Sequence, residues 1–183
     1  MPKEIKEGWG MATCSNRPNR VYITDGTGTI KIYDIDLATD KLKLVNELRV
    51  RFPAEDLDNF FSSLKSNFYM FPVGSSDPYE VNYLNELECV DDRFLFVNVY
   101  VTHYILKIDL SNGIVRNVYD FSDLVYKVVK PKVRDFNIGM HAFNGIAYDG
   151  RRSNKLFYLT GKDWPDIYKV ELLGDGDFDE SNM

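Results

Sequence analysis

Short runs of alternating hydrophobic and polar positions recur along the chain and predict antiparallel strands. The clearest runs come in pairs, and the first run of each pair begins with a basic residue: 20–25 with 30–34, 93–98 with 105–109, and 155–160 with 167–171. Alternation at period two, bounded by polar and glycine positions, is typical of strands that bury one face. Each pair is therefore expected to form a β-hairpin.

Further strand-like runs accompany these hairpins. One precedes each hairpin, at 7–12, 84–89 and 143–148, and another follows the first two hairpins, at 42–45 and 114–118. Repeated groups of four strands, with no clear amphipathic helix between them, are typical of propeller blades. The pattern therefore predicts an all-β fold, a β-propeller of about three blades.

The spacing of the copies predicts insertions. They are 73 residues apart (from 20 to 93) and 62 apart (from 93 to 155), whereas a blade usually takes roughly 40 to 50 residues. We expect the excess near 51–80, where 56–64 could form a short helix, and near 125–141. The propeller domain is assigned to residues 1–173, and residues 174–183 are expected to form an acidic, flexible tail.

Charge and composition exclude several kinds of partner. The 183 residues include 28 acidic and 22 basic side chains, for a formal net charge of −6, which argues against nucleic acid or an anionic membrane as the main partner. No apolar run reaches the roughly 18 to 20 residues needed to cross a bilayer, so membrane insertion is not expected. The first residues lack the apolar core of a signal peptide, so the chain itself leaves the compartment open.

The cysteines and histidines suggest no metal centre. Cys14 and Cys89 form neither a CxxC motif nor a disulfide framework, and we expect them to be small buried apolar residues. His103 and His141 have no companion at ligand spacing. We therefore predict neither a metal nor another cofactor.

The blade connectivity predicts where a site would lie. The start of a blade's first strand and the end of its second share one face, so six polar or aromatic residues should gather around one mouth of the channel: Trp9, Asp25, Asn85, Tyr100, Asn144 and Lys162. Loops on one face of a repeat array commonly carry binding residues.

Structural roles stay open for several of these residues. Trp9 could simply pack at a tight turn, Asn85 and Asn144 could bond turn backbone, and Lys162 could be solvated. Glu86 and Glu88 alternate with Leu87 and could face the neighbouring blades.

Seven segments, in order, resemble the motifs of the plant- and bacterial-type glutamine cyclotransferases. They are 7–10 (EGWG), 25–27, 84–88, 98–100, 108–110, 144–149 and 160–165 (TGKDWP). The resemblance spans nearly the whole chain. It implies a five-bladed propeller family, of which this chain corresponds to about the last three blades, an incomplete ring.

The resemblance also implies roles for particular residues. Trp9 is similar to the aromatic wall residue of the EGWG motif, Asn85 to the asparagine that binds the substrate amide, and Lys162 to the lysine near the substrate carbonyl. Asn85 and Lys162 are thus the catalytic candidates, and Trp9, Tyr100, Asn144 and Asp25 the substrate-binding ones. Tyr100 stands where the family usually has tryptophan, which keeps a ring but adds a hydroxyl.

The activity implied is closure of amino-terminal glutamine to pyroglutamate, with release of ammonia, on peptide or protein substrates. A carboxylate moves the proton, asparagine and lysine hold the amide oxygen, and aromatic walls fold the side chain. The alternative is a non-catalytic propeller module that mediates interactions.

One departure affects these expectations. The family's catalytic glutamate precedes the EGWG motif, and this chain begins only a few residues ahead of Glu7. By itself the chain is therefore expected to be weakly active or inactive. Open blade edges would also make it marginally stable or self-associating. Members of the family are usually exported.

Overall fold

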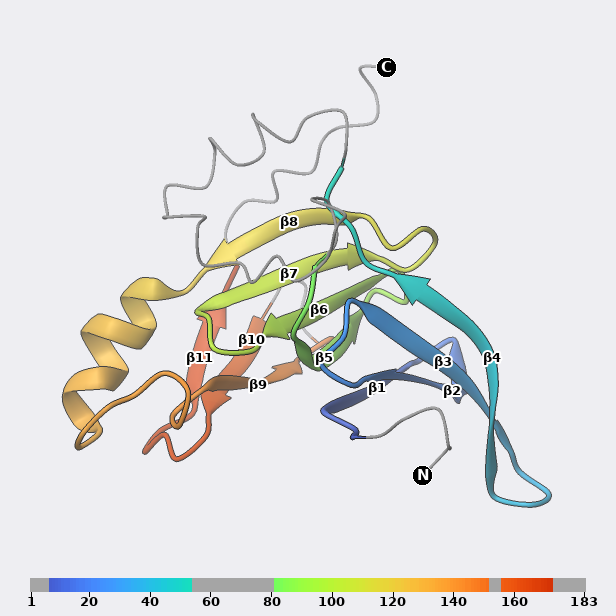
Figure 1. The fold of residues 1–183 in the computed structure, drawn as a ribbon, viewed down its shortest axis with the longest axis horizontal. Coiled ribbons are helices and arrows are strands. Elements are labelled where there is room, and N and C mark those ends of the chain that lie inside the picture. The colour runs from blue at the N-terminus through green and yellow to red at the C-terminus, as the bar shows by residue number, and fades with distance from the viewer. Residues whose placement is uncertain (1–6, 54–80, 152–155, 173–183) are drawn as a thin grey trace.

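The computed structural model describes residues 7–53, 81–151 and 156–172, which form three antiparallel sheets (Figure 1). Blade 1 contains β1 (Gly10–Cys14), β2 (Arg17–Thr24), β3 (Thr29–Asp36) and β4 (Lys41–Arg49), hydrogen-bonded in that order. Blade 2 contains β5 (Leu84–Val90), β6 (Phe94–Val99), β7 (Tyr104–Asp109) and β8 (Val115–Asp120), again in sequence order. Blade 3 contains β9 (Phe143–Tyr148), β10 (Leu156–Gly161) and β11 (Tyr168–Glu171).

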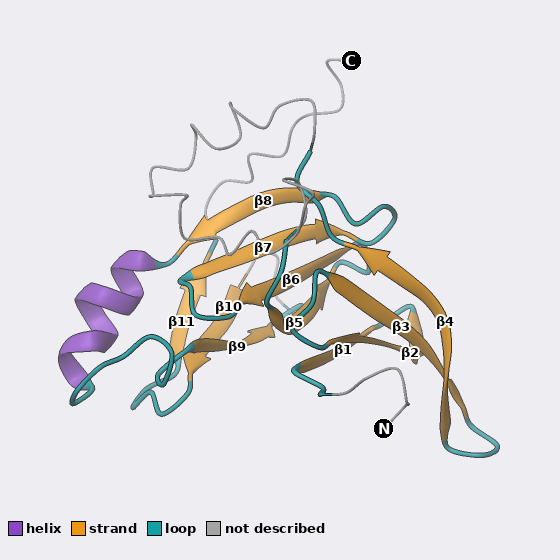
Figure 2. Cartoon of the chain, in the orientation of Figure 1, coloured by secondary structure: helices purple, strands orange, loops and turns teal. Residues whose placement is uncertain are grey.

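The fold is the predicted all-β arrangement of propeller-type blades (Figure 2). Each blade is an antiparallel meander, as expected for strands joined by short turns. The first strands of the blades lie side by side, β1 against β5 and β5 against β9. The helix expected at 56–64 and the tail expected at 174–183 lie outside the described residues. Of the two expected insertions, the one near 125–141 is described.

Apolar side chains fill both spaces between the blades. One cluster joins blade 1 to blade 2 and includes Ile30 and Ile32 of β3 with Leu87 and Leu106 of blade 2. A second cluster joins blade 2 to blade 3 and includes Phe96 and Phe157, whose ring centroids lie 4.9 Å apart. Alternation along each strand sends successive side chains to these opposite faces, so blade 2 is covered on both sides.

A helical segment that the sequence pattern did not predict joins β8 to β9. It comprises η3 (Leu124–Val129) and η4 (Lys130–Lys132), at the place expected to be an insertion. Val125 and Val129, four residues apart, are fully buried in the cluster between blades 2 and 3. Valine has a low helix propensity and one such pair gives a weak periodic signal, which explains why the pattern missed it. Among the described residues, no helix is long and apolar enough to cross a membrane.

The expectation that Cys14 and Cys89 are separate apolar residues is wrong, because they form a disulfide between β1 and β5. Their Cα atoms lie 5.3 Å apart, within the range that a disulfide requires. Both side chains are buried. The cross-link therefore ties the first strands of blades 1 and 2 to each other.

Candidate functional site

The strand register brings the predicted site residues to the same end of their blades. Gly10 pairs with Thr24, Leu84 with Val99, and Phe143 with Gly161. Trp9 therefore lies opposite Asp25. Tyr100 bonds to Tyr83, two residues before Asn85, and Lys162 bonds to Ala142, two residues before Asn144. Contacts between the blades join these pairs into one mouth.

Trp9 and Tyr100 form an aromatic wall across blades 1 and 2. Their ring centroids lie 5.2 Å apart in an edge-to-face arrangement, which is favourable for aromatic pairs. The Trp9 ring lies on the β2–β3 turn, because a Cβ at Gly26 would come within 2.8 Å of it. Gly26 also has φ of 80°. The turn therefore favours glycine both because the Trp9 ring leaves no room for a side chain and because the backbone is left-handed.

Asn85 lies where β1, β2 and β5 meet. The Thr24 hydroxyl donates to the Asn85 carbonyl at 2.6 Å, and a side chain at Gly10 would come within 2.7 Å of the Glu86 Cα. These close approaches fix the backbone on both sides of Asn85. The residue is 5% exposed, and among the described residues we find no hydrogen-bond partner for the side-chain amide. The backbone that carries this amide is thus fixed, and the amide is not used in an internal hydrogen bond with a described residue.

Asn144 connects blade 3 to the strand that carries Asn85. Its Oδ1 accepts a hydrogen bond from the Glu86 amide at 3.3 Å. Next to it, the Gly145 amide donates to Oδ1 of the fully buried Asn98 at 3.3 Å. Sequence reasoning did not single out Asn98. Its only signal was a position inside the segment 98–100 that carries the family resemblance.

A loop from the insertion after η4 reaches both Tyr100 and the Lys162 turn. The Tyr100 hydroxyl donates to the Gly139 carbonyl at 3.2 Å, and the Lys162 amide donates to the Ala142 carbonyl at 2.9 Å. The Trp164 indole donates to the His141 carbonyl at 3.0 Å. The Lys162 side chain is exposed and has no ion pair with any described residue. The loop thus holds the lysine turn against blade 2 and leaves the ammonium accessible.

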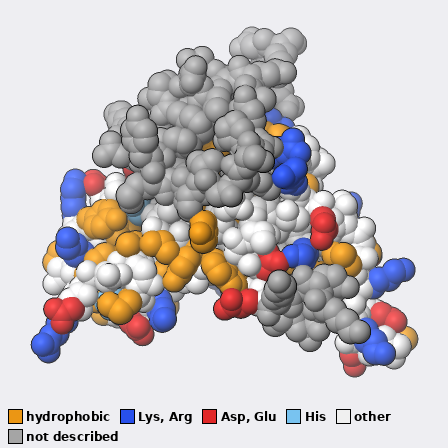
Figure 3. Space-filling model, viewed as in Figure 1, with side chains coloured by type: hydrophobic (Ala, Val, Ile, Leu, Met, Phe, Trp, Pro, Cys, Tyr) orange, Lys and Arg blue, Asp and Glu red, His pale blue; other side chains and the backbone are white. Residues whose placement is uncertain are grey.

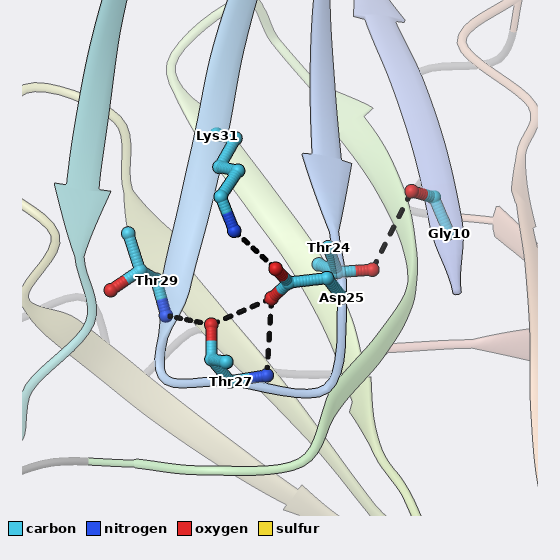
Figure 4. A network of polar contacts seen from close by, with 6 residues as sticks. All are labelled: Gly10, Thr24, Asp25, Thr27, Thr29 and Lys31. Atoms are coloured by element: carbon cyan, nitrogen blue, oxygen red, sulfur yellow. Dashed lines mark hydrogen bonds and ion pairs between the residues drawn. The ribbon is translucent and has the colours of Figure 1, made fainter. Parts of the chain in front are cut away.

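Asp25 is engaged by its own turn (Figure 4). Its carboxylate pairs with the Lys31 ammonium and accepts from the Thr27 hydroxyl at 2.6 Å and the Thr27 amide at 3.3 Å. Burial alone would raise the pKa of Asp25, but Lys31 and Thr27 outweigh it and hold the pKa below its ordinary value. These contacts give Asp25 a role in fixing the β2–β3 turn.

Two half-buried carboxyls, Glu86 and Glu88, follow Asn85 along β5 on the face opposite Leu87. Burial raises the pKa of Glu86. Burial, together with the charge of Glu86, raises the pKa of Glu88 to about 7. A carboxyl at this pKa exchanges its proton near neutral pH.

Glu88 should make the stability of the protein depend on pH. Because its pKa is higher in the folded than in the unfolded chain, the folded state binds the proton more tightly. The stability gained from this tighter proton binding is present below the unfolded pKa of about 4.5 and is lost as pH rises towards 7. Between pH 5 and pH 7.5 we expect the free energy of unfolding to fall by about 1 kcal/mol more for the wild type than for Glu88→Gln, after allowance for solvent screening. Urea unfolding at the two pH values measures this; equal losses would contradict it.

No open metal site is evident among the residues that the structure describes. The one cluster of potential ligands contains Cys14, Cys89 and Asp92. The two sulfurs are bonded to each other, and Asp92 accepts hydrogen bonds from Ser15 and Asn16. A shallow depression of about 680 Å³ lies at the far end of blade 1, near Asn16 and the Arg20–Asp34 ion pair, away from the mouth.

Blades packed face to face, with polar and aromatic residues at one mouth, define a β-propeller protein with a candidate site at that mouth. The chain belongs to the glutamine cyclotransferase family, whose model matches residues 73–172, more than half of the sequence.

Solved structures share this fold. Glutaminyl cyclase of Myxococcus xanthus superposes with a TM-score of 0.63 at 22% identity, over 91% of this chain and 56% of that one. A luciferin-regenerating enzyme superposes with a TM-score of 0.52 at 17% identity, over 93% of this chain and 46% of that one. The chain thus spans little more than half the length of the first and less than half of the second. No curated protein sequence matches it significantly.

Proposed function

We propose that the protein acts on peptides with amino-terminal glutamine and that its mouth binds the glutamine side chain. The observation that carries this proposal is Asn85, whose side-chain amide has no hydrogen-bond partner among the described residues, at the same mouth as the Trp9–Tyr100 wall in a chain of the glutamine cyclotransferase family. A side-chain amide without a protein partner can pair with a ligand amide without breaking an internal hydrogen bond. The side-chain amide of glutamine offers the matching donors and acceptor.

The reaction we propose is intramolecular. The α-amine nitrogen attacks the γ-carboxamide carbon, the new N–C bond closes the five-membered ring, and the bond to the amide nitrogen breaks. One proton passes from the amine to the leaving nitrogen, so pyroglutamate and ammonia form without an added reactant. A carboxylate is the natural carrier of that proton, and family resemblance places it ahead of Glu7.

The described residues supply binding and electrostatic stabilisation. Negative charge develops on the amide oxygen as the amine attacks, and the Lys162 ammonium and Asn85 NH₂ can both donate to that oxygen. Trp9 and Tyr100 restrict the flexible glutamine side chain to a folded conformation, which lowers the entropic cost of ring closure. Asn144 fixes the spacing between blades 2 and 3 through Glu86.

The activity is tested by incubating the protein with the peptide Gln-Ala-Ala and measuring ammonia and pyroglutamate. We expect slow formation of both in equal amounts, and none from the N-acetylated peptide, whose nitrogen cannot attack. A folded protein that binds Gln-Ala-Ala but returns it unchanged would instead support a non-catalytic propeller.

We further propose that the open blade edges let the chain self-associate. Among the described residues, β11 at the edge of blade 3 pairs only with β10. Unpaired backbone groups at a sheet edge favour pairing with a strand of another chain. Sedimentation velocity should therefore show an average mass that rises with protein concentration. A single monomeric species over a hundredfold concentration range would contradict this prediction.

The buried disulfide between Cys14 and Cys89 also favours an oxidising compartment for this protein.

A further inference from the structure

Exposed apolar side chains surround the mouth on the side of Tyr100. Tyr83, Val101 and Met140 keep 41%, 38% and 56% of their surface exposed. They come from three places in the sequence: the residue before β5, the turn after β6, and the loop after η4. Figure 3 shows hydrophobic side chains gathered on the left of the visible face, where the β6–β7 turn and the helical segment lie.

Backbone and side-chain contacts hold these three residues around Tyr100. The Tyr100 amide donates to the Tyr83 carbonyl at 2.8 Å, and Val101 follows directly. The Tyr100 hydroxyl donates to the Gly139 carbonyl, next to Met140. The Tyr83 amide donates to Gly26, on which the Trp9 ring lies. The apolar rim of Tyr83, Val101 and Met140 is thus continuous with the aromatic wall of the candidate site.

The backbone of this rim is strained at two positions. Tyr83 has φ of 62° and Val101 has φ of 63°, a left-handed conformation that bulky and β-branched residues rarely adopt. Asparagine or glycine would fit this conformation with less strain. Large apolar side chains therefore occupy positions where neither backbone preference nor solvent exposure favours them, and such strain is typical of functional sites.

We propose that the Tyr83–Val101–Met140 rim binds an apolar side chain at the second position of the substrate peptide. This inference rests on the proposed function, because the rim adjoins the Trp9–Tyr100 wall, where the residue after a glutamine held at Asn85 would lie. Apolar surface beside that exit favours a large apolar second residue over a small one. Contact with part of a phenylalanine side chain corresponds to about a tenfold gain in affinity over alanine.

The test measures binding of four peptides to the full chain by isothermal titration calorimetry: Gln-Phe-Ala, Gln-Ala-Ala, Met-Phe-Ala and Met-Ala-Ala. Binding requires no turnover, so it reports on the rim even if the reaction is slow. Methionine has nearly the length of glutamine but no amide. We expect Gln-Phe-Ala to bind about tenfold more tightly than Gln-Ala-Ala.

The matched variant is Tyr83→Asn/Val101→Asn, which removes the apolar surface and suits the left-handed backbone. We expect it to melt no earlier than wild type and to reduce the phenylalanine preference to about twofold or less. Equal binding of the two glutamine peptides by wild type, or a preference that survives in the folded variant, would overturn the rim proposal. A different result would contradict the proposed function: wild type would then bind Gln-Ala-Ala and Met-Ala-Ala equally well. Absence of binding by all four peptides would overturn both.

Discussion

Replacing Lys162 with alanine is expected to slow pyroglutamate formation by about a hundredfold or more. The ammonium would stabilise the oxyanion that forms as the amine attacks, and loss of one such donor typically costs roughly 10² to 10³ in rate. The side chain is exposed, and the Lys162 turn is held by the backbone bond to Ala142, so the variant should fold normally. Initial rates of ammonia release from Gln-Ala-Ala measure the effect.

The control for this experiment is Lys169→Ala. Lys169 is also exposed, but it lies on β11 opposite Tyr158, away from the mouth. The Lys169→Ala substitution removes the same charge from the same blade, so this variant should release ammonia at a rate within about twofold of wild type. If the two variants slowed the reaction equally, general electrostatic attraction would explain the effect and the role proposed for Lys162 would be wrong.

Removing the disulfide in the double variant Cys14→Ala/Cys89→Ala should lower the free energy of unfolding by about 4 kcal/mol. The bond closes a loop between residues 75 positions apart, and a cross-link of that length restricts the unfolded chain strongly. It also joins the first strands of blades 1 and 2, at the ends of β1 and β5 away from Asn85. Denaturant unfolding of the wild type and of the double variant measures the loss.

Reducing agent provides the control for the disulfide. It should lower the stability of the wild type to near that of the double variant and leave the variant unchanged. A difference below about 1 kcal/mol between oxidised wild type and variant would show that the apolar contacts between the blades, rather than the cross-link, hold β1 to β5.

The strands could be predicted because each one alternates and is bounded by turn residues. In β3, for example, Ile30 and Ile32 alternate with Lys31 and pack in the cluster between blades 1 and 2, as the pattern indicates. The shared mouth followed from connectivity alone, because the register in an antiparallel pair places the start of one strand beside the end of the next.

Contacts between blades were harder to predict because they depend on which strands become neighbours. The cysteines are far apart in sequence, and only the packing of β1 against β5 brings them together. The bond between Asn98 and Gly145 and the contact of Tyr100 with Gly139 depend in the same way on three-dimensional placement. The helical segment was missed because two valines carry most of its buried face.

The central claim is that this mouth recognises amino-terminal glutamine through its side-chain amide. The most direct measurement is the affinity of Gln-Ala-Ala relative to Met-Ala-Ala, by calorimetry, for wild type and for Asn85→Ala. We predict that wild type prefers the glutamine peptide by about tenfold or more and that Asn85→Ala loses this preference, since the Asn85 amide would no longer pair with that of glutamine. Equal affinity of wild type for the two peptides would contradict the account.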